Sequence, residues 1–146
     1  GAIPTPFYTY VYYHGDKWAE YGDEKVRWMF AHKSFLDYGI PVAPASDYMP
    51  GPYEPLMALQ SMVTRTDFRG YEWGTNQRVS VAEALKICTM NGAYASFEER
   101  LKGSITVGKL ADFVLLAEDP HGVDPNRLKD IKVERTVVGG RTMHGG

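Results

Sequence analysis

A single carboxylate at the end of an apolar run is the side chain in this sequence best placed for chemistry. Residues 40–45 are mostly apolar, and Ser46 and Asp47 follow them before a loop rich in proline and glycine. A buried strand that ends in this way presents its acid at the rim of a sheet, where α/β enzymes carry their reactive groups. There Asp47 could accept and return a proton. An ordinary turn aspartate is the alternative, and the residues alone leave both interpretations open.

Three other patterns that could carry chemistry point to structural roles. Ser46 could be a nucleophile, but it lacks the surrounding Gly-x-Ser-x-Gly motif of a hydrolase elbow. Gly108-Lys109 lacks the upstream glycine spacing and the following Ser or Thr of a phosphate-binding loop. Cys88, the single cysteine, falls on an apolar helical face and is expected to pack in the core. Neither covalent serine chemistry nor phosphate binding is therefore favoured.

The first half of the chain shows the strand, helix and strand order of a parallel sheet. Residues 7–13 are rich in aromatic and β-branched types and predict a strand, with a turn at residues 14–16. Residues 23–38 predict a helix that begins at Asp23 and stops at Gly39, and residues 40–45 predict the second strand. This order is typical of a right-handed βαβ unit. It would place Asp47 at the carboxyl end of the second strand.

Two further helices are predicted before the chain becomes β-rich. Residues 54–66 have helical spacing, residues 67–78 form an aperiodic loop, and a capping box at residues 80–83 begins another helix. Asn91 and Gly92 are expected to interrupt this helix, with Asn91 capping the piece that follows. Residues 110–116 predict a buried strand, and residues 133–143 predict a hairpin that turns at Gly139-Gly140.

Composition limits the class of protein and its partners. At 146 residues and 44% hydrophobic content, the chain can supply the core of one domain. A net charge of −2 without a basic cluster argues against a nucleic-acid partner, and no apolar run is long enough to predict a membrane span. One cysteine cannot form an internal disulfide, which favours a reducing cytoplasm.

The order of these segments resembles the C-terminal part of the metal-dependent amidohydrolase superfamily, in the branch called amidohydrolase family 3. The similarity covers nearly the whole chain from about residue 12, and the Gly-Ser-Ile-x-x-Gly-Lys-x-Ala-Asp run of residues 103–112 is its most specific string. The other matching segments are residues 39–47, 80–93 and 137–141.

The resemblance implies a fold and a division of the chain. The fold class is α/β: residues 1–100 would form the last two βα units of a TIM barrel, strands seven and eight with the helices after them. Residues 101–146 would be a β-rich segment of an accessory β-sandwich domain. A complete barrel takes about 250 residues. The chain is therefore expected to be a fragment that associates with itself or with the missing barrel portion.

The resemblance also implies a role for Asp47. In that superfamily, an aspartate at the end of strand eight binds a divalent metal, here expected to be zinc, and moves a proton between the attacking water and the leaving group. Metal binding lowers the pKa of a water to about 7, which makes the proton transfer feasible. Tyr13, His14 and Tyr48 follow the two strand ends and are the candidate substrate-binding residues.

The sequence departs from the superfamily in its metal ligands. It contains no His-x-His pair, and its four histidines are scattered over positions that match none of the superfamily's ligands: His14, His32, His121 and His144. Catalytic zinc needs about three protein ligands. We therefore expect the parent protein to hydrolyse a non-peptide C–N bond of a small molecule, while this chain alone is inactive and binds no stoichiometric metal. A non-catalytic structural or interaction module built from the same fold piece is the alternative.

Overall fold

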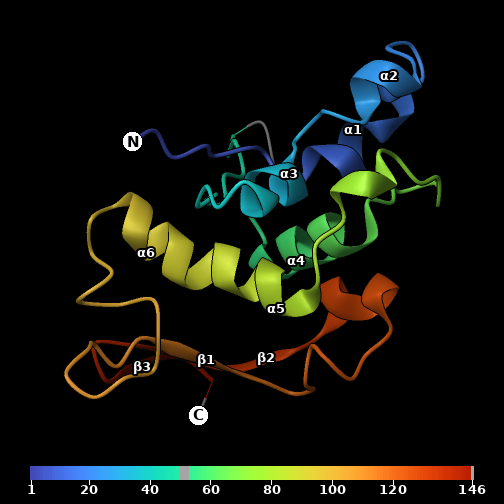
Figure 1. The fold of residues 1–146 in the computed structure, drawn as a ribbon. Coiled ribbons are helices and arrows are strands. Elements are labelled where there is room, and N and C mark those ends of the chain that lie inside the picture. The colour runs from blue at the N-terminus through green and yellow to red at the C-terminus, as the bar shows by residue number, and fades with distance from the viewer. Residues whose placement is uncertain (50–52, 146) are drawn as a thin grey trace.

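The structure is a computed structural model that describes residues 1–49 and 53–145. Helices fill the first two thirds of the chain, and a three-stranded sheet lies beneath them (Figure 1). The Pro50 to Pro52 part of the predicted proline and glycine loop lies outside the described residues. The elements are α1 (Tyr10–Trp18), α2 (Asp23–Val26), α3 (His32–Asp37), α4 (Pro55–Thr64), η1 (Thr75–Gln77), α5 (Val81–Lys86), η2 (Ile87–Asn91), α6 (Gly92–Ala95), β1 (Phe113–Leu116), η3 (Pro125–Asp130), β2 (Val133–Val138) and β3 (Arg141–His144).

Two extended segments pair in parallel near the N-terminus. The amide of Ala43 donates to the carbonyl of Pro4 at 3.1 Å, and the amide of Tyr8 donates to the carbonyl of Ala45 at 3.1 Å. Phe7 and Ala45 form a parallel bridge. The sequence predicted such a pair, but it placed the first strand at residues 7–13. That placement is wrong, because the pairing involves residues 4–8 and a helix follows directly.

Helix α1 takes the place of the predicted strand and also of the turn predicted at residues 14–16. Val11, Gly15 and Trp18 recur at helical spacing and are the buried residues of α1. A β-carbon on Gly15 would lie 2.8 Å from the Asp67 side chain, so glycine permits the close approach of α1 to the loop after α4. Burial of this face outweighs the strand preference of the aromatic residues, because strand propensity depends on context.

The single helix predicted over residues 23–38 is instead two short helices, α2 and α3. Phe30 lies between them with φ 49°, in the left-handed region, and this conformation breaks the helical path. Gly39 ends α3 with φ 69°, as the sequence predicted, and its amide donates to the carbonyl of Leu36 at 2.9 Å. The break matters for the site because it turns Met29 and Phe30 toward α1.

Helices α4 and α5 follow the sequence prediction closely. Pro55 occupies the first turn of α4, and the Ser80–Glu83 capping box begins α5. The predicted interruption at Asn91 and Gly92 is wrong: α5, η2 and α6 form one continuous helical rod (Figure 1). Asn91 does not cap the last piece, because its side-chain amide donates to the carbonyl of Val42 at 2.9 Å. This bond ties the rod to the segment that leads to Asp47.

The core consists of two buried clusters. The larger joins the segment before Asp47 to α4 and α5, and the smaller joins α1 to α2. Their main members are Val42, Leu59, Met62 and Ile87 in the first, and Val11, Trp18 and Val26 in the second. Among residues 1–49 and 53–145, no helix has both the length and the apolar character needed to cross a membrane.

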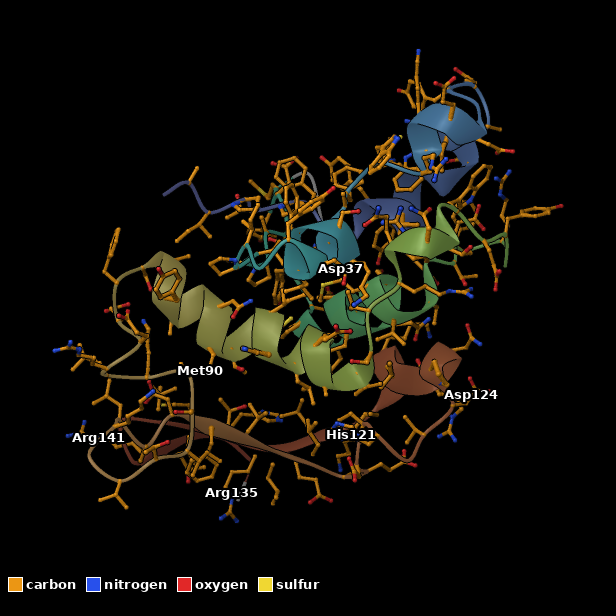
Figure 2. All side chains as sticks on the ribbon, in the orientation of Figure 1. Asp37, Met90, His121, Asp124, Arg135 and Arg141 are labelled. Atoms are coloured by element: carbon orange, nitrogen blue, oxygen red, sulfur yellow. The ribbon has the colours of Figure 1, made fainter. Side chains whose placement is uncertain are left out.

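The C-terminal sheet has the order β1-β2-β3 and is antiparallel throughout. The hairpin turns at Gly139 and Gly140, which have φ values of 56° and 76°, as the sequence predicted. The predicted burial of the preceding strand is wrong, since Val114 and Leu115 in β1 are 54% and 49% exposed. Helices lie on one side of the sheet (Figure 1), and Arg135 of β2 points away from them (Figure 2). Strand β1 is therefore apolar and exposed, because no other described residues cover the side of the sheet that faces away from the helices.

Candidate active site

Asp47 lies just beyond the paired segments, at the carboxyl end of the second. Its backbone is left-handed with φ 55°, and its side chain is half-buried. The phenol of Tyr10 donates a hydrogen bond to Oδ2 of Asp47. This bond raises the pKa of the Tyr10 phenol, because a phenolate beside the carboxylate would lose the bond and meet a like charge. The arrangement holds one carboxylate oxygen, and no hydrogen bond within residues 1–49 and 53–145 occupies the other.

Neighbouring aromatic rings hold Tyr10 in place. Its ring centroid lies 5.0 Å from that of Phe7, 5.7 Å from that of Phe30 and 4.8 Å from that of His14. The last two contacts are edge-to-face, which is a favoured geometry for aromatic pairs. Tyr10 therefore reaches Asp47 from a packed cluster of rings rather than from a free surface position.

The predicted substrate-binding residues divide into two groups in the structure. His14 lies one helical turn beyond Tyr10 and packs on its ring, which places it in the neighbourhood of Asp47. Tyr13 packs instead on Tyr12, with centroids 5.0 Å apart, and Tyr48 is 63% exposed and packs on Tyr53. The roles predicted for Tyr13, His14 and Tyr48 remain predictions.

Sequence reasoning missed Tyr10. The sequence places this residue inside a predicted strand, which indicates no partner for its hydroxyl. Its i, i+4 spacing to His14 and the Val11, Gly15 and Trp18 stripe were the available signals, and both indicate a helix.

Ser46 has a local structural role. Its hydroxyl accepts a hydrogen bond from the amide of Tyr48 at 3.2 Å, closing the turn that carries Asp47. Cys88 is half-buried, and burial raises the pKa of its thiol to about 12. Such a thiol is a poor nucleophile at neutral pH.

A buried arginine fixes the chain beside the Tyr10 cluster. The guanidinium of Arg65 donates to the carbonyls of Met29 at 3.0 Å, Phe30 at 3.3 Å and Trp73 at 3.0 Å, and it lies 5.3 Å from the ring centroid of Trp18. Burial lowers its pKa to about 10, which leaves it charged at neutral pH. Through its hydrogen bond to the Phe30 carbonyl, Arg65 fixes the backbone that positions the Phe30 ring.

Asp67 organises the loop that closes over Arg65. Burial alone would raise the pKa of its carboxyl group. Hydrogen bonds from the Trp73 indole, from the Tyr71 amide, and from the amide and guanidinium of Arg69 more than offset this, so the pKa is lowered overall. The indole bond is 3.0 Å long and orients Trp73 against Gly15. Asp67 is thus committed to structure, which leaves Asp47 as the acid available at the paired strand ends.

The described residues do not form a metal site by themselves. Within residues 1–49 and 53–145, no group of three or more His, Cys, Asp or Glu side chains lies close enough together to hold an ion. Asp47 could supply one ligand, whereas a catalytic zinc takes about three from the protein.

Comparison with known proteins gives a consistent result. The family model described as the amidohydrolase family matches residues 2–144. The chain is 31% identical over 126 residues to YtcJ of Bacillus subtilis (strain 168), a protein described as an amidohydrolase. It is 35% identical over 112 residues to the N-substituted formamide deformylase of Arthrobacter pascens. These alignments cover 84% and 77% of this chain but 24% and 21% of the relatives, so the chain spans less than a quarter of either relative's length.

A solved structure shares the fold. The E. coli guanine deaminase matches 99% of this chain and 34% of its own chain, with a TM-score of 0.65 and 20% sequence identity. The α/β class expected from the sequence is confirmed, and the number of barrel strands within the chain remains a prediction.

Proposed function

The chain belongs to the amidohydrolase family, and on that premise we propose that it forms the C-terminal portion of a metal-dependent hydrolase that cleaves a non-peptide C–N bond of a small molecule. In this proposal, residues 1–100 complete a TIM barrel with its last two βα units, and residues 101–146 belong to an accessory β domain. Asp47 is the catalytic residue of this portion. The remaining barrel strands would come from chain beyond these 146 residues.

The observation that carries the proposal is the position of Asp47. It follows directly after two parallel segments, at their carboxyl ends, which is where barrel enzymes hold their reactive groups. The Asn91 bond to Val42 and the Tyr10 bond to Oδ2 fix the backbone before it and the carboxylate itself. A residue fixed in this way satisfies the geometric demand of proton transfer, in which small displacements are costly.

Asp47 would act as general base and then as general acid. Its carboxylate oxygen that does not accept from Tyr10 can take a proton from an attacking water and deliver it to the leaving nitrogen. Tyr10 keeps the carboxylate oriented during both transfers. A raised Tyr10 pKa keeps its phenol protonated, so the bond persists at neutral pH.

The metal expected for the family would be held mainly by residues outside this chain. Asp47 is the candidate ligand in this chain, and no group of three possible ligands occurs among the described residues. When bound, a divalent ion such as zinc lowers the pKa of a coordinated water. We expect the 146-residue chain alone to bind no stoichiometric metal and to be inactive.

The test compares Asp47→Asn with Asp23→Asn in the complete protein that carries these residues. Asp23 is an exposed acid in the first turn of α2 and serves as the matched control. We expect Asp47→Asn to lower kcat on an amide substrate by about a hundredfold or more, and Asp23→Asn to leave it unchanged. Metal content is measured for each variant. Normal turnover by Asp47→Asn with its metal in place would refute the role of Asp47.

A further inference from the structure

A groove lined by aromatic side chains includes Tyr10, the hydrogen-bond partner of Asp47. Its volume is about 390 Å³, which is within the usual range for ligand pockets. We call it the aromatic groove. Its lining includes Tyr10, His14, Lys17 and Trp18 of α1, and Tyr21 and Phe30 from the chain that follows.

The walls of the aromatic groove are fixed before any ligand arrives. The Trp18 and Phe30 rings are stacked, with centroids 5.5 Å apart and an angle of 18° between their planes. Arg65 anchors this wall, because its guanidinium holds the Phe30 carbonyl and lies over the Trp18 ring. A preorganised aromatic wall loses little conformational entropy on binding and suits a flat ring.

Tyr10 connects the aromatic groove to the chemistry. Its ring lines the groove, while its hydroxyl donates to Asp47. Asp47 does not itself line the groove, so a group seated there would reach the carboxylate past Tyr10. The groove therefore adjoins the proposed active site through Tyr10.

The charge of the lining selects among ring substituents. Lys17 is exposed at the groove, and in the part of the chain that the structure describes no carboxylate lines it. A cationic substituent would meet the like charge of Lys17, whereas a neutral or anionic one would not.

From these observations, and resting on the proposed function, we propose that the aromatic groove binds the flat aromatic group of the amide substrate, with that group neutral or anionic. The relative specificity of the hydrolase for aromatic over small aliphatic amides would then come from residues 10–30. Tyr10 has two functions: its ring contacts the substrate, and its hydroxyl positions Asp47.

The test uses Tyr21→Ala in the complete protein, with Tyr38→Ala as the matched control. Tyr21 and Tyr38 are 51% and 81% exposed, so neither substitution opens the core. Loss of one aromatic contact is expected to lower kcat/KM for benzamide about three- to tenfold, while kcat/KM for acetamide stays within about twofold. Tyr38→Ala changes neither value. Equal losses for both amides in Tyr21→Ala, or no loss for benzamide, would overturn the proposal.

The charge argument is tested with Lys17→Glu against Lys86→Glu, an exposed lysine of α5 outside the groove. Lys17→Glu is expected to reduce kcat/KM for 4-carboxybenzamide relative to benzamide about threefold or more. Lys86→Glu should leave that ratio unchanged. An unchanged ratio in Lys17→Glu would overturn the preference for anionic groups.

A binding measurement separates this proposal from the proposed function. Saturation-transfer NMR with benzamide reports occupancy of the groove without any turnover. If no amide is hydrolysed but benzamide binds and Tyr21→Ala weakens it, the groove is a ligand site and the hydrolase assignment fails. If amides are hydrolysed but benzamide binding does not change in Tyr21→Ala, the hydrolase assignment stands and the groove proposal fails.

Discussion

Acid should destabilise this protein through one buried histidine, His32, at the start of α3. Its ring is 1% exposed, its Nδ1 lies 2.9 Å from the Phe30 carbonyl, and its Nε2 is buried without a partner among the described residues. Because a carbonyl only accepts, Nδ1 must carry the proton in the neutral ring. Burial, and then the nearby charge of Arg65, lower the His32 pKa from 6.5 to about 4, although the Phe30 bond acts in the opposite direction.

Acid lowers the unfolding free energy because the folded and unfolded states bind different numbers of protons at His32. Between pH 6.5 and 4, the unfolded chain protonates His32 while the folded protein keeps it neutral, so acid favours unfolding. At roughly 1.4 kcal/mol per pH unit, this interval amounts to about 3 kcal/mol of lost stability. The loss is complete near pH 4 and absent above pH 7.

The assay compares urea unfolding at pH 7 and pH 4 for the wild type, His32→Gln and His121→Gln. His32→Gln retains a hydrogen-bond donor but cannot titrate, and His121 is an exposed control. Between pH 7 and pH 4, we expect the unfolding free energy of the wild type and of His121→Gln to fall by about 3 kcal/mol more than that of His32→Gln. Acid losses that agree within about 0.5 kcal/mol would refute the reasoning, as would an NMR titration midpoint for His32 near 6.5.

Three further predictions concern packing. Arg65→Met is expected to lower the unfolding free energy by about 3–5 kcal/mol relative to the exposed control Arg100→Met, because three carbonyls lose their donor; equal urea midpoints would contradict this. Gly15→Ala should cost about 1–3 kcal/mol, since the new β-carbon would lie 2.8 Å from Asp67, and an unchanged Tm would count against it. The isolated 146-residue chain should self-associate through the apolar side chains that β1 exposes. Light scattering after gel filtration would show oligomers, and a stable monomer would disprove it.

Local signals in the sequence predicted local structure well. The Ser80 capping box, the Pro55 start of α4 and the Gly139-Gly140 hairpin each depend on residues within a few positions of one another. The capping box forms because the first amides of a helix need acceptors. Proline suits the start of a helix because its φ is fixed, and glycine suits the hairpin turn because it tolerates a positive φ. None of these causes requires knowledge of the rest of the molecule.

Predictions that depended on neighbours distant in sequence failed. The aromatic residues of α1 favour a strand only if a sheet surrounds them, whereas here the Val11, Gly15 and Trp18 face packs on α2 and the Trp73 loop. Burial of β1 was inferred from its apolar residues, but burial is set by whatever covers a strand. Phe30 carries no sequence mark of the left-handed conformation that divides α2 from α3.

The contact between Tyr10 and Asp47 depends on the register of the two parallel segments, which the sequence alone did not predict. Phe7 and Ala45 form the parallel bridge, and Tyr10 and Asp47 lie three and two residues further along their segments. Parallel pairing brings the carboxyl ends of both segments to the same edge of the sheet, and α1 begins there with Tyr10. A first strand placed at residues 4–8 would therefore have placed Tyr10 at the edge that carries Asp47. A substitution that changes the register of residues 4–8 is therefore expected to separate Tyr10 from Asp47 without altering either residue.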